Sequence, residues 1–81
     1  MVDKIIELVC EVKEGTVKQE EITADSHMLK DVGLDSLQLV NLILLVEETF
    51  DVEIDFDLFD YSVLDSVKKF ASFVEMQMEE E

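Results

Sequence analysis

The chain has 81 residues, the size of one small domain, which leaves no room for a deep enzyme cleft. Its net charge of −15 repels nucleic-acid phosphates and anionic membrane surfaces, and favours protein partners with basic surfaces. The single cysteine excludes an internal disulfide, and no apolar run is long enough to span a membrane. We therefore expect one monomeric cytoplasmic domain over residues 1–81, with its last few residues frayed.

The first predicted helix covers VDKIIELVCEVKEG, where apolar residues recur at helical spacing. Gly15 is expected to end this helix. Cys10 lies on the flank of the apolar stripe, so we expect a half-buried small hydrophobe there. Its neighbours are mainly acidic, which argues against a reactive thiol. The predicted buried face consists of Val2, Ile5, Leu8, Val9 and Val12.

Residues 16–34 form a long polar connection, which needs apolar anchors in so small a domain. His27 in this connection is the only histidine, and no cysteine lies near it in the sequence to share a metal ion. We therefore expect it to be a surface loop residue and not a metal ligand. The candidate anchors are Ile22, Met28, Leu29, Val32 and Leu34.

A second helix is predicted to start after Asp35, which caps it, with Ser36 in its first turn. On a helical wheel its core face consists of Leu39, Leu42, Ile43, Val46 and Phe50. The opposite face would normally be polar throughout. Here it carries a group of apolar residues framed by acids, which indicates a docking surface. These outward residues are Leu37, Val40, Leu44 and Leu45.

Acidic and apolar residues then alternate from residue 51 to residue 57, which superficially resembles a strand. A single acidic strand has no partner in this chain. We therefore predict a loop through Ile54, followed by a short third helix from Asp57 to Tyr61.

The same stretch partly resembles the calcium-binding EF-hand loop. Asp51, Glu53 and Asp55 occupy its first, third and fifth places. Phe56 and Ser62, however, stand where this loop requires a glycine and a glutamate. We therefore predict no dedicated metal site.

The last predicted helix lies in DSVKKFASFVEMQMEEE, with Asp65 or Ser66 as its cap and Lys68 and Lys69 facing outward. Its buried face is predicted to be Val67, Phe70, Ala71, Val74 and Met78. The predicted fold is all-α: a four-helix bundle with three longer helices, one short third helix and a long first loop. Its core would combine Ile5, Val9, Leu42, Val46, Phe50, Ile54, Phe70 and Val74.

Ser36 is a poor candidate for an enzyme nucleophile, because His27 is on the loop and the Gly-x-Ser-x-Gly elbow is absent. It is a suitable place to carry a phosphate, since free backbone N–H groups and the positive end of the helix dipole meet there. The simpler alternative is that Asp35 and Ser36 only cap a helix.

The segments DVGLDSL and EETFDVEI, within an acidic helical chain of this length, resemble the acyl carrier proteins. The resemblance extends from the first helix to about Val74. It centres on the triplet of Asp35, Ser36 and Leu37, preceded by Gly33. It implies a four-helix bundle with a long first loop, in agreement with the prediction from the residues.

The resemblance also implies that Ser36 receives 4′-phosphopantetheine from coenzyme A through a separate Mg²⁺-dependent phosphopantetheinyl transferase. The thiol of that arm would carry acyl groups as thioesters, and the chain would be a carrier and not an enzyme. Asp35 and Leu37 would complete the attachment motif. Acyl-processing or acyl-loading enzymes would dock through basic patches. The docking residues implied are Val40, Asn41, Leu44, Leu45, Glu47, Glu48, Asp57 and Asp60.

Two positions depart from the fatty-acid carriers, in which the residues matching Gln38 and Asn41 are commonly acidic. The departures argue against a housekeeping fatty-acid role and favour a dedicated carrier in a specialised polyketide, lipid, fatty-acid-like or amino-acid-loading pathway. A discrete aminoacyl or peptidyl carrier stays open as an alternative. Two further alternatives are an acidic helical interaction module that is never modified and a small calcium-responsive protein.

Overall fold

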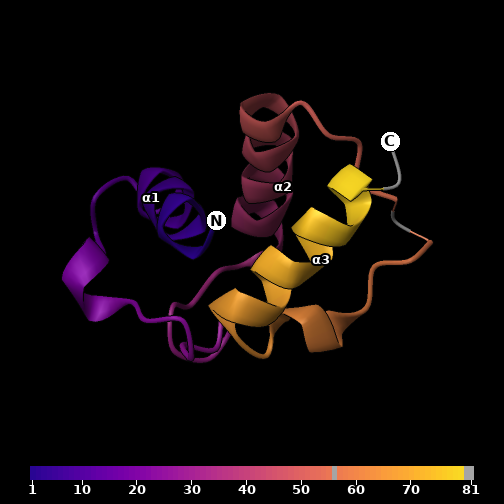
Figure 1. The fold of residues 1–81 in the computed structure, drawn as a ribbon. Helices are drawn as coiled ribbons and strands as arrows, with labels where there is room; N and C mark the ends of the chain where they lie inside the picture. Colours follow the sequence, from indigo (N-terminus) through magenta and orange to yellow (C-terminus); the bar gives the residue numbers. More distant parts are fainter. Residues whose placement is uncertain (56, 80–81) are drawn as a thin grey trace.

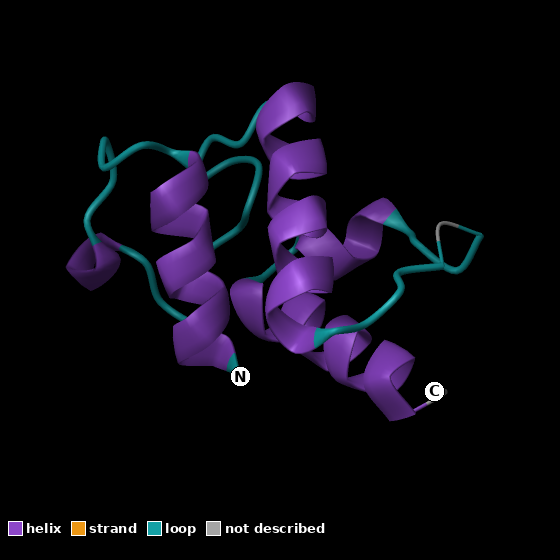
Figure 2. Cartoon of the chain, turned by 90° about the horizontal axis from the view of Figure 1, so that it is seen from above, coloured by secondary structure: helices purple, strands orange, loops and turns teal. Residues whose placement is uncertain are grey.

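The computed structural model describes residues 1–55 and 57–79, and these residues form helices and loops without a strand (Figures 1 and 2). The α-helices are α1 (Val2–Val12), α2 (Ser36–Phe50) and α3 (Val67–Glu79). Two short 3₁₀ helices are η1 (Gln19–Glu21) and η2 (Tyr61–Leu64). The all-α class, with three longer helices and a short one before the last, is confirmed. None of the described helices has the length and apolar character needed to cross a membrane.

Helix α1 ends where the backbone turns left-handed at Glu14 and Gly15, with φ of 56° and 80°. The Gly15 N–H donates to the Cys10 carbonyl at 3.1 Å, so Gly15 takes part in the helix stop as predicted. The buried face contains Ile6, which the helical wheel left out. Val2 and Val12, by contrast, are only partly buried and pack at the edge of the core.

The long first loop is fastened to the C-terminal part of the chain by backbone hydrogen bonds. The Met28 N–H donates to the Leu64 carbonyl at 3.0 Å, and the Val67 N–H donates to the Ser26 carbonyl at 3.1 Å. The predicted anchors Ile22, Met28, Val32 and Leu34 are buried, and Leu29 is partly buried. The loop is therefore part of the packed structure.

The short third helix is not where the sequence pattern placed it. Asp57 and Leu58 lie in a turn, in which the Asp57 N–H donates to Asp55 Oδ1 at 2.9 Å. The helix starts one turn later because Asp60 Oδ1 accepts the Ser62 N–H at 2.8 Å and so caps η2. Leu64 at the end of η2 is fully buried, which fixes this position.

Helix α3 is capped by Ser66, whose Oγ accepts the Lys69 N–H at 3.1 Å. Met78 is exposed, so its predicted place in the core is wrong; Gln77 is buried instead. The Gln77 Oε1 accepts the Asp55 N–H at 2.7 Å, which explains how a polar side chain is accommodated there. The predicted fraying of the last few residues falls mainly on residues 80 and 81, which lie outside the described residues.

The core combines buried residues from all three α-helices, the loops and η2. The predicted members Ile5, Val9, Leu42, Val46, Ile54, Phe70 and Val74 all belong to it. Phe50 is only partly buried and packs against the outside of this core, which corrects the prediction. It is the last residue of α2, where the chain turns away through the left-handed Asp51.

Candidate functional site

Ser36 is the first residue of α2, and its side chain is exposed. The helix start is fixed by its neighbours: Asp35 Oδ1 accepts the Gln38 N–H at 2.7 Å, and the Asp35 N–H donates to Gln38 Oε1 at 3.2 Å. These reciprocal bonds form a capping box, so the predicted Asp35 cap is confirmed. Since Asp35 and Gln38 cap the helix, the Ser36 hydroxyl is not needed for that purpose.

The turn before Ser36 is also held from α1. Lys13 Nζ donates to the Gly33 carbonyl at 3.1 Å and to Gln38 Oε1 at 3.4 Å. Gly33 has a φ of 79°, a left-handed conformation that favours glycine. The sequence reasoning missed Lys13, because these contacts join residues that are 20 and 25 positions apart.

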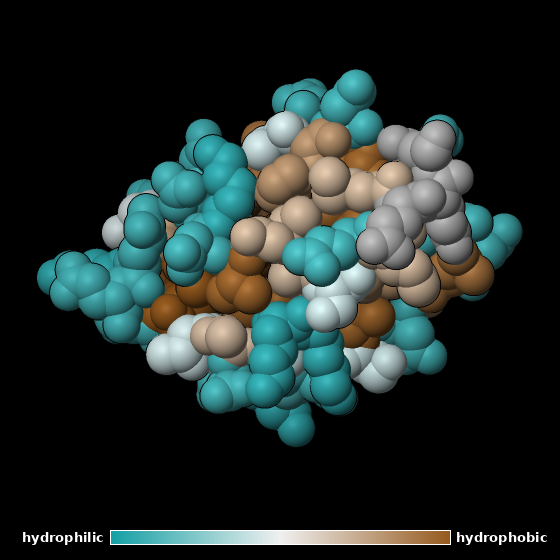
Figure 3. Space-filling model, in the orientation of Figure 1, coloured by the Kyte–Doolittle hydropathy of each residue, from teal (hydrophilic) through white to brown (hydrophobic). Residues whose placement is uncertain are grey.

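A groove of about 800 Å³ opens beside Ser36. Asp35, Ser36 and Asp60 supply its polar lining. Its apolar lining consists of Leu29, Leu34, Leu39, Val40, Ile43, Phe59 and Tyr61. Apolar surface is visible between polar side chains on the face of the molecule in Figure 3. An exposed hydroxyl therefore stands at the edge of a mainly apolar groove.

Aromatic contacts hold one wall of this groove. The rings of Phe59 and Tyr61 meet edge-to-face with centroids 6.2 Å apart, and those of Phe59 and Phe73 do so at 5.9 Å. Phe73 belongs to α3 and is buried, whereas Tyr61 is exposed. The wall is thus anchored to the core at one end and open to solvent at the other.

The outer face of α2 carries the expected apolar group. Leu37, Val40 and Leu44 are 70%, 51% and 52% exposed. Asn41 and Glu48 are also exposed. Leu45 is different: it is partly buried and packs against the core, so its assignment to the outward face is wrong. Leu58, which the sequence did not predict as an outward residue, is also an exposed leucine, with 49% of its surface accessible.

Some acids expected to face partners bind backbone amides of this chain. Glu47 is partly buried, and its Oε2 accepts the Ile54 N–H at 2.9 Å. Asp35 and Asp60 cap α2 and η2 as described above. Asp57, in contrast, is an exposed turn residue instead of a helical one. The acidic rim therefore also stabilises the fold.

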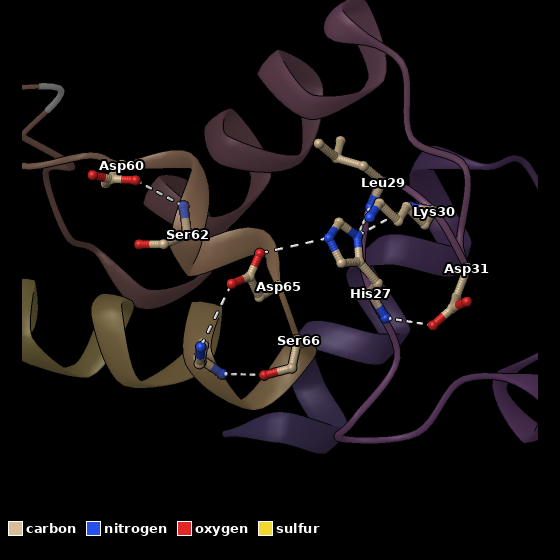
Figure 4. A network of polar contacts seen from close by, with 9 residues as sticks. His27, Leu29, Lys30, Asp31, Asp60, Ser62, Asp65 and Ser66 are labelled. Carbon is tan, nitrogen blue, oxygen red and sulfur yellow. Dashed lines mark hydrogen bonds and ion pairs between the residues drawn. The ribbon is translucent and has the colours of Figure 1, made fainter.

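His27 organises the first loop (Figure 4). Its Nδ1 accepts the N–H groups of Leu29 and Lys30, both at 3.1 Å, and its own backbone N–H donates to Asp31 Oδ2 at 2.8 Å. Its Nε2 lies 3.5 Å from Asp65 Oδ1, at the end of η2. The side chain is only 23% exposed. The prediction of a simple surface loop residue is therefore wrong, because His27 holds the loop in place through these contacts.

The described residues offer neither a metal-binding cluster nor a reactive thiol. Within residues 1–55 and 57–79, no group of three or more His, Cys, Asp or Glu side chains could hold a metal ion. Cys10 is half-buried, and burial raises the pKa of its thiol, with the negative charge of Glu21 adding to this effect. Such a thiol is mostly protonated near neutral pH and reacts slowly.

Comparison with known proteins gave consistent matches. A family model described as "Phosphopantetheine attachment site" matches residues 3–74. An acyl carrier protein from Prochlorococcus marinus (strain MIT 9515) is 37% identical over 54 residues, which cover 64% of this chain and 68% of that protein. The solution NMR structure of a holo acyl carrier protein from Nitrosomonas europaea matches with a TM-score of 0.84 and 26% identity, covering 96% of this chain and 95% of that one.

Proposed function

Because the chain belongs to the acyl carrier protein family, we propose that Ser36 is the residue that bears its covalently attached 4′-phosphopantetheine arm. Members of this family are carriers and not enzymes. When attached, the arm supplies a terminal thiol that holds acyl groups as thioesters. The observation that carries the proposal is the exposed Ser36 hydroxyl on a helix start that Asp35 and Gln38 already cap.

The surroundings of Ser36 suit a phosphodiester. The first backbone N–H groups of α2 and the positive end of its dipole favour an anion at this position. In the transfer, the Ser36 oxygen forms a bond to the phosphorus of coenzyme A that bears the pantetheine. The bond from that phosphorus to adenosine 3′,5′-bisphosphate breaks.

The proton of the Ser36 hydroxyl must leave in the same reaction. His27 Nδ1 already accepts two backbone N–H groups of the loop, so this chain offers no histidine base. The phosphopantetheinyl transferase must therefore supply the base that activates Ser36.

We further propose that the cargo is an acyl intermediate of a polyketide, lipid or fatty-acid-like pathway. The groove beside Ser36 is lined mainly by apolar side chains, which favours an apolar acyl chain over a small aminoacyl group. The cargo is tested by loading the modified chain with an octanoyl or a glycyl thioester. Methyl NMR signals of Leu39 and Ile43 should move with octanoyl and stay in place with glycyl. Unchanged signals with both would count against the groove as an acyl site.

The outer face of α2 is the surface we propose for docking of the transferase and of acyl-processing or acyl-loading enzymes. Leu37, Val40 and Leu44 form its exposed apolar centre, and Glu48 lies on the same helix. Gln38 and Asn41 are neutral, so apolar fit should matter more here than on an entirely acidic helix. Acids at the edge would attract basic partners and speed association.

Intact-mass spectrometry tests the attachment residue. The chain is incubated with coenzyme A, Mg²⁺ and a broad-specificity phosphopantetheinyl transferase. Wild type should gain the mass of one 4′-phosphopantetheine, and Ser36→Ala should gain none. Ser72→Ala, at an exposed serine of α3, is the matched control and should be modified like wild type. A Ser36→Ala chain that still gains the arm would disprove the assignment.

A further inference from the structure

We propose that Lys13 is a positioning residue for the attachment of phosphopantetheine, a role that rests on Ser36 being the attachment residue. The Lys13 ammonium contacts the chain on both sides of Ser36. It lies 3.1 Å from the carbonyl of Gly33, three residues before Ser36, and 3.4 Å from Oε1 of Gln38, two residues after it. The C-terminal end of α1 is thereby fastened to the turn that presents the hydroxyl.

Gln38 connects Lys13 to the helix cap. Its Oε1 accepts both the Asp35 N–H and the Lys13 ammonium, which the two lone pairs of an amide oxygen permit. Both donors require the oxygen of the amide, and not its NH₂ group, to point toward the turn. Lys13 therefore fixes the amide in the orientation that caps α2. Without Lys13, a single backbone N–H would hold that orientation.

Lys13 also fits closely against the glycine of the turn. A Cβ atom added to Gly33 would lie 3.9 Å from Lys13 Nζ. The ammonium thus lies directly beside the left-handed residue that aims the chain into α2. By holding the Gly33 carbonyl, it restricts the backbone two residues before the capping box begins at Asp35.

The position of this charge is unusual for a cation, because positive charge near a helix N-terminus opposes the helix dipole. The charge itself therefore does not stabilise α2, although the hydrogen bond of Lys13 to Gln38 supports the helix cap. From residue 31 to residue 67 the sequence has no lysine or arginine, so Lys13 brings a positive charge from α1 to this turn.

Loss of Lys13 should lower the fraction of free carrier whose Ser36 turn is ready for transfer. A smaller competent fraction weakens apparent binding by the same factor, while the reaction of the bound, ordered complex is unaffected. Losing hydrogen bonds at exposed or half-exposed positions should lower this fraction about three- to tenfold, because water replaces part of what each bond contributes even when one partner is charged. The KM of the transferase for the carrier should therefore rise and kcat should change little.

The experiment compares Lys13→Met, Lys13→Arg and Lys4→Met as substrates of the transferase at saturating coenzyme A. Lys13→Met keeps the aliphatic stem and should raise KM about three- to tenfold, with kcat within about twofold of wild type. Lys13→Arg should restore most of the loss, because guanidinium N–H groups reach the same acceptors. Lys4→Met removes the same unit of charge from the exposed side of α1 and should behave like wild type.

Amide hydrogen exchange gives a readout that needs no transferase. The Asp35 and Gln38 amides should exchange faster in Lys13→Met than in wild type and recover in Lys13→Arg. Unchanged exchange, or a KM equal to that of wild type, would overturn the role of Lys13. An equal rise in KM for Lys4→Met would also overturn it, because general charge would then be the cause. A Ser36→Ala chain that is still modified would refute the attachment residue and the role of Lys13 with it, whereas a failure of the Lys13 variants alone would leave Ser36 as the attachment residue.

Discussion

Replacing His27 with alanine should loosen the first loop where it meets η2 and α3. The imidazole Nδ1 is the acceptor for the Leu29 and Lys30 N–H groups, and Nε2 reaches Asp65. Alanine removes the acceptor and the contact with Asp65 together. The backbone bond from the Met28 N–H to the Leu64 carbonyl stays in place, so the loss should be local and the fold should persist.

The magnitude follows from the surroundings of each lost bond. The bond to the Leu29 N–H is partly buried, and leaving such a donor without an acceptor costs about 1–3 kcal/mol. The bond to the Lys30 N–H is exposed, so water replaces His27 there at little cost. The Asp65 side chain is 51% exposed, and a surface contact of His27 Nε2 with this carboxylate contributes at most about 1 kcal/mol. The Leu29 bond dominates, so we expect a total of about 1–3 kcal/mol.

Urea denaturation of His27→Ala and wild type measures this loss, and a domain of this size should lose about 4–8 °C of melting temperature per kcal/mol. Asp65→Asn is the control, since it removes the charge but leaves the backbone bonds to Nδ1. It should cost well under 1 kcal/mol. The reasoning is refuted if His27→Ala is as stable as wild type, or if Asp65→Asn costs as much as His27→Ala.

The remaining predictions concern the core, the docking face and the thiol. Phe70→Ala should cost about 3–5 kcal/mol of unfolding free energy because Phe70 is buried, and Phe50→Ala should cost clearly less because Phe50 is half-buried. Equal losses of stability in urea denaturation would contradict the placement of Phe50 outside the core. Binding of the modified carrier to an immobilised cognate enzyme tests the docking face. Leu44→Ala should lose about 1–2 kcal/mol of binding free energy at every salt concentration, whereas Glu48→Lys should slow association mainly at low salt. If Leu44→Ala binds as tightly as wild type, Leu44 is not an apolar anchor. Because the pKa of Cys10 is raised in the folded chain, its thiol should react with iodoacetamide at pH 8 more slowly in the folded chain than in the chain unfolded by urea. The stability that the protonated thiol contributes at lower pH should be lost as the pH rises through the raised pKa. Equal reaction rates in the folded and unfolded chains would contradict this.

The parts of the fold that depend on neighbouring residues were predictable from the sequence. The Asp35 cap is followed directly by an apolar run of helical period, and both signals act within a few residues of each other. The stop of α1 at Gly15 is local for the same reason. The short third helix was misplaced because its position depends on the buried Leu64, whose carbonyl is bonded to the distant Met28 N–H, as well as on the local Asp60 cap.

The candidate site shows the same division. The exposed Ser36 on its helix start follows from a short motif, and Leu44 on the outer face follows from helical period. Glu47 was expected to face partners, but it accepts the Ile54 N–H across a bend of the chain that sequence spacing does not reveal. His27 and Lys13 act through residues far from them in the sequence, so their roles could not be predicted from the residues beside them.

The acids that bind backbone amides affect how the docking surface should be mapped. Asp35, Glu47 and Asp60 each hold an N–H of the chain with one carboxylate oxygen. An alanine or charge-reversal scan of these positions would unfold a helix cap or a loop together with the loss of charge, and weakened affinity would be misattributed to the contact surface. Substitution by the isosteric amides asparagine and glutamine keeps an acceptor oxygen in place and removes only the charge. Such a scan would separate electrostatic attraction of a partner from the local order on which the surface depends.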